Sequence, residues 1–509
     1  MVDAVGQELG AVPRGDGSVE VRVWAPSVTS LDVHAANGVH ALERGDDDVY
    51  YGRFRGAAGD EYLLAVNGVE THPDPVSRHQ PYGVRGPSQF VDLGALEWTD
   101  TGWEGLALDD LVLYELHVGT FSEAGTFDGV VPRLRALREL GVTAIELMPV
   151  ATFPGERGWG YDGLYTFAPH PAYGGPAGLA RLVDAAHAEG LGVILDVVYN
   201  HLGPGSEALT MFAPYLSAEH RTFWGDAIDY AERGVREWAL QNAEQWVRDF
   251  HADGVRLDAV GTIVDETPRH ICAELADRVH AASPRALVIS EIEVGDWRPL
   301  DEWGHDAQWC DASHHELHVL LTGEREGYYA GYGSVSALAR DLQGAGRNPR
   351  GLVICAQNHD QVGNRATGDR LSPDALRVAA AVTLFSPCTP LLFMGEEHFE
   401  EHPFQFFTDH IDPAIAEATR AGRKQEFAAF TSFAGEDVPD PQCVDTFLRS
   451  KLSERGPDPF YRELVELHRT LPRELEIVQV DEQAKRLHLR RGGAELVADF
   501  RAHTVEVQR

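Results

Sequence analysis

The stretch Asp196-Val-Val-Tyr-Asn-His201 follows the apolar run Gly192-Val-Ile-Leu195, and this succession decides the fold. The same pattern recurs in Gly254-Val-Arg-Leu-Asp258, Ile289-Ser-Glu291 and Asn358-His-Asp360, where strand-like residues end in acidic or imidazole side chains. Helical patterns separate the four segments. A polar group at the carboxyl end of each of several strands, with helices between them, is how a (β/α)₈ barrel builds an active site.

The region around these segments alternates strand-like and helical runs. Alternation of this kind implies parallel strands with right-handed crossovers, and eight strands are enough to close a barrel. The sequence therefore predicts an α/β protein with a (β/α)₈ TIM barrel. The expected strands are 111–116, 143–148, 192–198, 253–258, 286–290, 306–310, 351–356 and 389–394, and the expected helices are 127–140, 177–189, 231–250, 266–281, 334–342, 374–385 and 458–470.

Both flanks of the barrel have a different character. Short runs of alternating side chains at 19–24, 30–34 and 61–66, separated by Gly, Asp and Pro, predict an N-terminal β-sandwich. The strand-like runs 476–480, 486–490 and 495–497 predict a short C-terminal β appendage. We expect three units: a carbohydrate-module-like sandwich over 1–95, the catalytic barrel over 96–472 and a small β domain over 473–509.

The chain is strongly acidic. Its 43 Lys and Arg against 80 Asp and Glu give a net charge of −37. Such a surface repels phosphate backbones and anionic lipid heads, so nucleic acid and membranes are not expected partners. A neutral substrate such as a sugar meets no such penalty.

Cysteine usage and the N-terminus predict a cytoplasmic location. The five cysteines are scattered without a CxxC pair, which is typical of free thiols in a reducing compartment. The N-terminal residues show neither a basic start nor an apolar stretch of signal length. No uninterrupted apolar run reaches the ~18 residues that a membrane helix needs.

Three carboxylates at predicted strand ends are the candidate catalytic residues. Asp258 is the expected nucleophile; Arg256 points to the same face of its strand and would hold the carboxylate ionised at neutral pH. Glu291 is the expected general acid/base because apolar neighbours favour its protonated form, with Glu293, which has the same facing, as its rival. Asp360 is the expected transition-state stabiliser, since retaining cleavage itself needs only two carboxylates.

Candidate substrate-binding residues lie at these and other strand ends, with Trp159 and Tyr161 just past the second strand. Trp159 and Tyr161 could stack on an apolar sugar face, and His201 and His359 could donate to sugar hydroxyls. Asp196, with Asn200, could be read as a cation ligand, but we favour a hydrogen-bonding role in which Asp196 braces Arg256. No Walker loop, GxGxxG or HExxH occurs, and His314-His315 is too isolated for a metal site, so we expect neither metal nor cofactor.

In order and spacing, the four segments resemble the signature regions of the α-amylase superfamily of glycoside hydrolases. Within it the chain resembles the maltooligosyltrehalose trehalohydrolase family, most diagnostically in Pro403-Phe-Gln-Phe-Phe-Thr-Asp-His410 and also in 114–119, 158–163, 314–323, 358–365 and 393–397. The resemblance implies a retaining glycosidase that cleaves the α-1,4-glucosidic bond next to the terminal trehalose of maltooligosyltrehalose and releases trehalose. It assigns Asp258, Glu291 and Asp360 the roles given above, and it implies a maltooligosyltrehalose synthase as functional partner.

The chain departs from that family's pattern after Glu291, at His398, where a Trp is expected, and in its short C-terminal region. None of these departures touches the three carboxylates. Two alternatives remain: a branching or debranching enzyme acting on α-1,4/α-1,6-glucan, which shares the catalytic residues, and a non-catalytic glucan-binding protein, against which the intact carboxylates argue.

Overall fold

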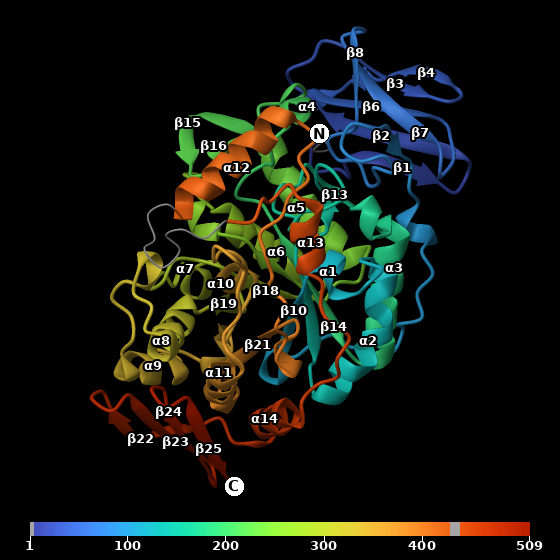
Figure 1. Cartoon of the computed structure of the whole chain (residues 1–509). Helices are drawn as coiled ribbons and strands as arrows, with labels where there is room; N and C mark the ends of the chain where they lie inside the picture. The colour runs from blue at the N-terminus through green and yellow to red at the C-terminus, as the bar shows by residue number, and fades with distance from the viewer. Residues whose placement is uncertain (1–4, 428–437) are drawn as a thin grey trace.

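Eight parallel strands close into a barrel at the centre of the chain, of which the computed structural model describes residues 5–427 and 438–509 (Figure 1). The (β/α)₈ fold is confirmed. Residues 1–4, in the predicted sandwich, and 428–437, in the predicted barrel, lie outside the described residues. The barrel strands, in order around the barrel, are β10 (Leu113–Leu116), β11 (Ala144–Leu147), β14 (Gly192–Val197), β17 (Gly254–Leu257), β18 (Leu287–Ser290), β19 (Ala307–Trp309), β20 (Leu352–Cys355) and β21 (Thr389–Phe393).

Amphipathic helices cover the outside of the barrel. In α2 (Phe127–Leu140) the residues Val130, Leu134 and Leu137 are buried on one face, and the Thr126 side chain caps the helix by accepting from the Gly129 N–H. Further helices lie where a helical pattern was predicted: α3 (Gly175–Glu189), α5 (Arg233–Arg248), α6 (Ile271–Ala282), α9 (Val335–Leu342), α11 (Pro373–Phe385) and α14 (Pro459–Thr470). Helix α8 (Asp311–Thr322) was not predicted. Its first half is rich in polar side chains, which do not suggest the buried helix that the structure shows.

The barrel interior is layered. Alternate strand residues point inward, and the inner floor is an apolar cluster that includes Leu113, Ala144 and Ile194. Two residues further along the same strands, Glu115, Glu146 and Asp196 follow, and Arg256 lies opposite Asp196 in the register. These strands therefore pass from an apolar floor to a polar layer toward their carboxyl ends.

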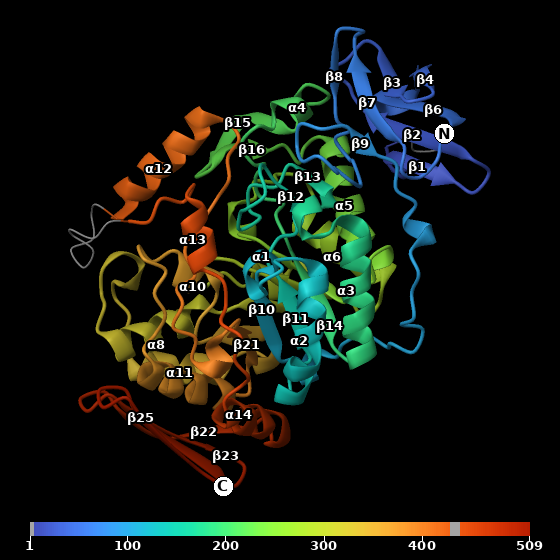
Figure 2. The ribbon, with the colours of Figure 1, turned by 45° about the vertical axis from the view of Figure 1, so that its right-hand side comes forward.

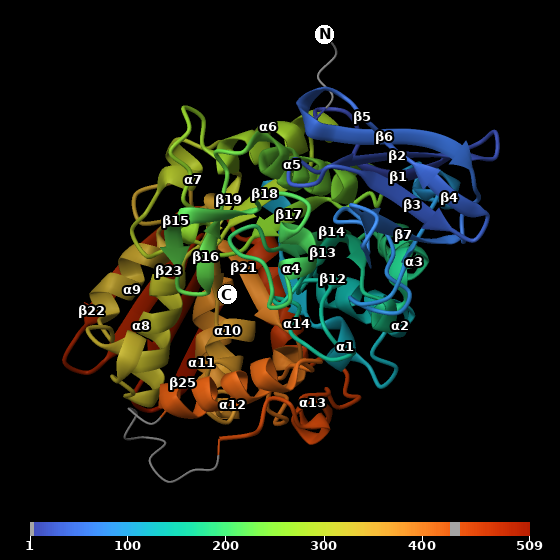
Figure 3. The same ribbon diagram turned by 90° about the horizontal axis from the view of Figure 1, so that it is seen from above.

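Two sheets at the N-terminus flank the barrel on one side (Figures 1 and 3). One contains β1 (Gly10–Arg14), β2 (Ser18–Trp24), β6 (Val49–Arg55) and β5 (Glu43–Arg44). The other contains β4 (Gly38–Ala41), β3 (Leu31–Ala35), β7 (Glu61–Val66) and β8 (Glu70–His72), with β9 (Ser88–Gln89) paired to β7.

A four-stranded antiparallel sheet ends the chain: β22 (Leu475–Asp481), β23 (Arg486–Arg491), β24 (Ala494–Asp499) and β25 (Thr504–Gln508). It packs against α11 and α9 at the amino-terminal end of the barrel (Figure 2). The predicted domain limits at residues 95 and 472 stay predictions. In the described part of the chain, no helix combines the length and apolar character that crossing a bilayer demands.

The loop after β21 is tied down by His398, the residue that stands in place of the expected Trp. Its Nδ1 lies 3.0 Å from Glu397 Oε1 and its Nε2 lies 3.2 Å from Glu400 Oε2. Glu400 also accepts from the backbone and hydroxyl of Ser453, which links this loop to a distant part of the chain. Burial lowers the pKa of His398, but the two carboxylates outweigh burial and raise the pKa to about 9.

Replacing His398 by Gln should remove a pH-dependent part of the stability. Because the pKa of His398 is about 9 in the folded chain and ordinarily about 6.5, its contribution is complete below about pH 6.5 and is lost as pH rises through about 9. The melting temperature of the wild type should fall over this interval more steeply than that of H398Q. H34Q, at an exposed position of β3, is the control. Parallel curves for wild type and H398Q would contradict this assignment.

Candidate active site

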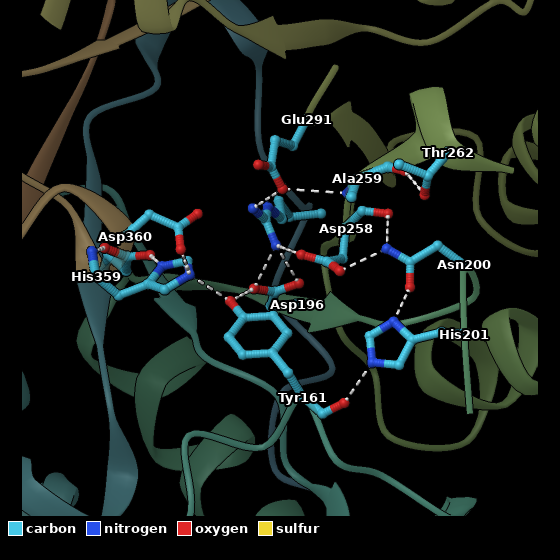
Figure 4. Close-up of polar contacts among 12 residues, drawn as sticks. Tyr161, Asp196, Asn200, His201, Asp258, Ala259, Thr262, Glu291, His359 and Asp360 are labelled. Atoms are coloured by element: carbon cyan, nitrogen blue, oxygen red, sulfur yellow. Dashed lines mark hydrogen bonds and ion pairs between the residues drawn. The ribbon is translucent and has the colours of Figure 1, made fainter. Parts of the chain in front are cut away.

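A cavity of about 640 Å³ opens at the carboxyl ends of the barrel strands. Asp258 follows β17, Glu291 follows β18, and Asp360 lies in the short helix α10 (His359–Gly363) after β20; all three line this cavity. Trp159, Tyr161, His201 and His359 line it as well. Figure 4 shows the carboxylates and the surrounding polar side chains converging on one space. The structure thus brings seven of the predicted site residues to one cavity, while Arg256 and Asp196 lie beneath its floor.

Arg256 is the centre of the polar network and is fully buried. Its Nη1 donates to Asp196 Oδ1 and Oδ2 at 2.8 and 2.7 Å and to Asp258 Oδ1 at 2.9 Å. Its Nη2 donates to Glu291 Oε2 at 2.5 Å. The guanidinium also lies 4.2 Å from the centre of the Trp309 ring. One cation therefore joins β14, β17 and β18, and Asp196 makes the bracing contact that the sequence led us to expect.

Asp258 is held from both sides. Besides Arg256, the Asn200 amide donates to its Oδ2 at 2.7 Å and to its backbone carbonyl at 3.1 Å. Burial raises the pKa of Asp258 more than Arg256 lowers it. Arg256 does favour the ionised form of Asp258, as expected from the sequence, but it acts against a larger effect of burial that the sequence did not reveal.

Glu291 is positioned by Arg256 and by a backbone donor. The Ala259 N–H lies 3.1 Å from Glu291 Oε2. Ala259 has a φ of 38°, in the left-handed region that non-glycine residues rarely adopt, so the chain is strained directly after Asp258. Burial raises the pKa of Glu291, as a proton donor near neutral pH requires. Its rival Glu293 is exposed, with its carboxylate beside Gly261.

Asp360 follows β20, which lies three strands around the barrel from β17, the strand that carries Arg256. Its Oδ1 accepts from the Asn364 amide at 3.0 Å and lies 3.4 Å from His359 Nε2. Burial raises the pKa of Asp360, while the charge of His359 lowers it. Asp360 is thus a carboxylate whose ionisation depends on its neighbouring imidazole.

The turn that carries Trp159 and Tyr161 depends on Gly160. Gly160 has a φ of 103°, and a Cβ there would lie 2.2 Å from the Pro149 carbonyl oxygen. The turn directs the Tyr161 hydroxyl to Asp196 Oδ2 at 2.6 Å and to His359 Nε2 at 2.7 Å. Trp159 donates from Nε1 to the Gln405 carbonyl, so its ring forms a fixed wall of the cavity.

His201 is held by hydrogen bonds to its neighbours. Its Nδ1 lies 2.5 Å from Asn200 Oδ1 and its Nε2 lies 2.9 Å from the Tyr161 carbonyl. Both ring nitrogens therefore have protein partners, and in this arrangement His201 positions Asn200 rather than offering a free donor to a sugar. The Trp224 ring stacks on it at 4.8 Å.

Several residues of the cavity were not predicted from the sequence. Phe223 and Trp224 extend from the hairpin of β15 (Leu216–Thr222) and β16 (Gly225–Ile228), and Tyr328 and Phe406 come from other loops. The Phe223 side chain is 95% exposed. The only indication of a binding role in the sequence was a pair of adjacent aromatic residues in an otherwise polar segment. No sequence pattern near the hairpin predicts that it lies at the mouth of the barrel.

In the part of the chain that is described, no three His, Cys, Asp or Glu side chains are grouped to hold a metal ion. The expected absence of metal and cofactor stays a prediction. The polar network already gives every carboxylate of the cavity a protein partner: Arg256 for Asp258 and Glu291, and Asn364 for Asp360.

An eight-stranded barrel with this cluster of carboxylates defines a glycoside hydrolase of the α-amylase type, and the family model for the alpha amylase catalytic domain matches residues 50–223. A malto-oligosyltrehalose trehalohydrolase of Deinococcus radiodurans is 42% identical over 505 residues, which cover 91% of this chain and 83% of that one. The enzyme of the same name from Saccharolobus solfataricus is 40% identical and covers 89% and 86%. The chain belongs to the malto-oligosyltrehalose trehalohydrolase family.

A solved structure shares the fold of the whole chain. A Salmonella typhimurium structure, provisionally described as an alpha amylase, superposes with a TM-score of 0.89 at 36% identity. The superposition covers 96% of this chain and 92% of that one, so the similarity extends over the flanking sheets as well as the barrel.

Replacing Arg256 by Met should destabilise the fold and abolish activity. The substitution leaves Asp196, Asp258 and Glu291 without their shared cation, and breaking a buried ion pair in this way costs about 3–5 kcal/mol. Urea unfolding measures the loss. R181M is the matched control, because Arg181 pairs with Asp128 at an exposed site, where an ion pair contributes only about 0–1 kcal/mol. Equal losses for both variants would contradict the central role of Arg256.

Proposed function

We propose that this enzyme hydrolyses the α-1,4-glucosidic bond next to the terminal trehalose of maltooligosyltrehalose and releases trehalose by a retaining mechanism. The proposal depends on one observation: a single buried guanidinium holds Asp258 at Nη1 and Glu291 at Nη2 in one cavity. Two carboxylates bound to the two terminal nitrogens of one guanidinium must lie close together. This arrangement fits the ~5–5.5 Å between the carboxyl groups of a retaining glycosidase better than the ~6.5–9.5 Å of an inverting one.

In the first step, Glu291 acts as general acid and Asp258 as nucleophile. The Glu291 proton passes to the glycosidic oxygen while an Asp258 oxygen attacks the anomeric carbon from the opposite face. Trehalose departs, and the maltooligosaccharide is left as a β-glycosyl ester of Asp258. Arg256 and the Asn200 amide favour the ionised form of Asp258 against its burial, and the raised pKa of Glu291 suits an acid that must hold its proton before the bond breaks.

In the second step, Glu291 acts as general base. Its carboxylate takes a proton from a water molecule, whose oxygen attacks the anomeric carbon and displaces Asp258. The maltooligosaccharide leaves with its original α configuration, and both side chains return to their starting states. Asp360 stabilises the oxocarbenium-like state between the two covalent states.

The remaining residues of the cavity bind and align the sugar. Trp159 and Tyr161 offer aromatic faces, and Asp360 with His359 offers polar groups on one side of the ring. Asp196 supports the site from below through Arg256 and Tyr161. His201 acts through Asn200, which donates to Asp258.

We also propose a cytoplasmic enzyme of trehalose biosynthesis that consumes the product of a maltooligosyltrehalose synthase. The described cysteines are all free thiols, as a reducing compartment requires. The family membership supports a substrate that another enzyme must first build on a glucan end.

Product analysis tests the reaction. The enzyme, incubated with maltopentaosyl-trehalose, should release trehalose and maltopentaose, and it should act far more slowly on a plain maltooligosaccharide. Chromatography of both mixtures measures the products. New branch points in a glucan, with no trehalose released, would favour the branching alternative, and binding without any product would favour the non-catalytic one.

Single substitutions test the roles of the two carboxylates. Glu291→Gln should lower kcat by ~10²–10⁴-fold, the usual contribution of a general acid/base, and Asp258→Ala should lower it by orders of magnitude. Substrate binding, measured by calorimetry, should persist in both variants. E293Q is the matched control and should keep near-normal turnover, because Glu293 is exposed. Near-normal activity of either catalytic variant would refute the assigned roles.

A further inference from the structure

Two glutamates face each other in register on neighbouring barrel strands, beneath the catalytic cavity. Glu115 on β10 pairs with Glu146 on β11, and each is 1% exposed. Glu115 is fully used: its Oε2 accepts from the His359 N–H at 2.8 Å, and its Oε1 lies 2.5 Å from His359 Nδ1. Neither oxygen of Glu146 has a hydrogen-bond partner among the described residues.

The charge of this pair is divided unequally. Burial, and then the neighbouring Glu115, raise the pKa of Glu146 well above its usual range. Two adjacent carboxylates cannot both ionise cheaply in a dry interior, so the one with donors keeps the charge. Glu115 is therefore the carboxylate and Glu146 the neutral acid.

The hydrogen bonds around His359 define its protonation state. Both oxygens of Asp196 already accept from Arg256, so the single proton of the Tyr161 hydroxyl must be the one shared with Asp196 Oδ2. The Tyr161 oxygen can therefore only accept from His359 Nε2, at 2.7 Å. Because His359 Nδ1 must also donate to the ionised Glu115, both ring nitrogens carry a proton.

We propose that Glu115 is a positioning residue that keeps His359 doubly protonated and directs its Nε2–H toward Tyr161 and Asp360 at the wall of the cavity. This inference rests on the proposed function, because the cavity served is the one assigned to the sugar. Glu115 is not among the residues that line the cavity and acts through His359, which it holds both at the backbone N–H and at Nδ1.

The consequence reaches the catalytic carboxylates. Burial lowers the pKa of His359, but Asp360 and Glu115 outweigh it and raise the pKa to about 10. The imidazolium in turn lowers the pKa of Asp360 against the effect of burial. The charge of Glu115 itself raises the pKa of Asp360, but the imidazolium that Glu115 sustains lowers it by more, so the pair favours an ionised Asp360 while the positive charge of the oxocarbenium-like state develops.

All the charged groups around His359 enter this balance. The carboxyl groups that interact with it are Glu115, Glu146, Asp196, Glu291, Asp311 and Asp360. Arg256 opposes its charge, and burial lowers the pKa of the nearby His117 to about 4, so that His117 is neutral. Glu115 is distinguished among these groups by direct contact with Nδ1.

The substitution E115Q tests the proposal. It keeps the shape of the side chain but removes the charge, so the pKa of His359 should fall. Turnover at pH 7 should fall by up to about 100-fold, the scale on which a misplaced active-site group acts. The ratio of E115Q to wild-type kcat should rise as the pH is lowered and His359 regains its proton, which loss of structure alone would not produce.

E146Q is the matched control, since it makes the same change at the register partner, where the acid is already neutral. It should leave the pH profile of kcat unchanged. Histidine ¹⁵N shifts, assigned by comparison with H359Q, give a direct readout that needs no substrate. Wild-type His359 should show two protonated nitrogens at pH 8, and in E115Q its titration should move to lower pH.

Each outcome decides the matter. A singly protonated His359 in the wild type at pH 8 would overturn the proposal even if E115Q fails to fold. An unchanged His359 titration in E115Q, or equal effects of E115Q and E146Q, would overturn it as well. If the shifts behave as expected but the wild type releases no trehalose, the proposed function fails and the protonation of His359 stands.

Discussion

The buried charge of Arg256 is the interaction on which the rest of the site depends. A guanidinium removed from water is costly unless carboxylates and hydrogen bonds surround it, and here Asp196, Asp258 and Glu291 do so. The reverse also holds: without Arg256 the carboxylates would repel one another and take up protons. One positive charge cannot neutralise three carboxylates, so one of the three acids can stay protonated. Glu291 is the acid to which we assign this proton.

A second ion pair, between Glu115 and His359, completes the arrangement on the opposite side. The two pairs meet at Tyr161, whose hydroxyl accepts from His359 and donates to Asp196. A continuous chain of hydrogen bonds therefore runs from β10 to β17 beneath the sugar-binding cavity. These hydrogen bonds hold the charged groups in place before the substrate binds. Charges that need no rearrangement during the reaction stabilise the transition state most effectively.

The barrel explains why these groups meet at all. Side chains two residues apart point to the same side of a strand, so on β10, β11 and β14 an apolar floor residue is followed by an acid, and on β17 Arg256 is followed by Asp258. Ile289 and Glu291 are also two residues apart, so their side chains point to the same side of the barrel wall. The catalytic carboxylates lie at the strand ends, the polar layer beneath supports them, and the flanking sheets lie outside the barrel.

The sequence predicted the parts that local pattern controls. The period of the strands and helices revealed the barrel, and strand ends such as Gly254-Val-Arg-Leu-Asp258 revealed the carboxylates. Glu115 could not be found in this way, because its partner His359 lies 244 positions away and only barrel closure brings them together. Helix α8 was missed because its histidines suggest an exposed segment although they are buried. The upward shift in the pKa of Asp258 could not be predicted, because the desolvation that causes it depends on the whole surrounding structure.

Trapping the covalent intermediate would identify the nucleophile. The enzyme would be incubated with a fluorinated maltosyl fluoride that forms the glycosyl ester quickly and hydrolyses it slowly, and digested peptides would then be mapped by mass spectrometry. We expect one added glycosyl group, on Asp258. A label on another residue, or none from an enzyme that still releases trehalose, would contradict it.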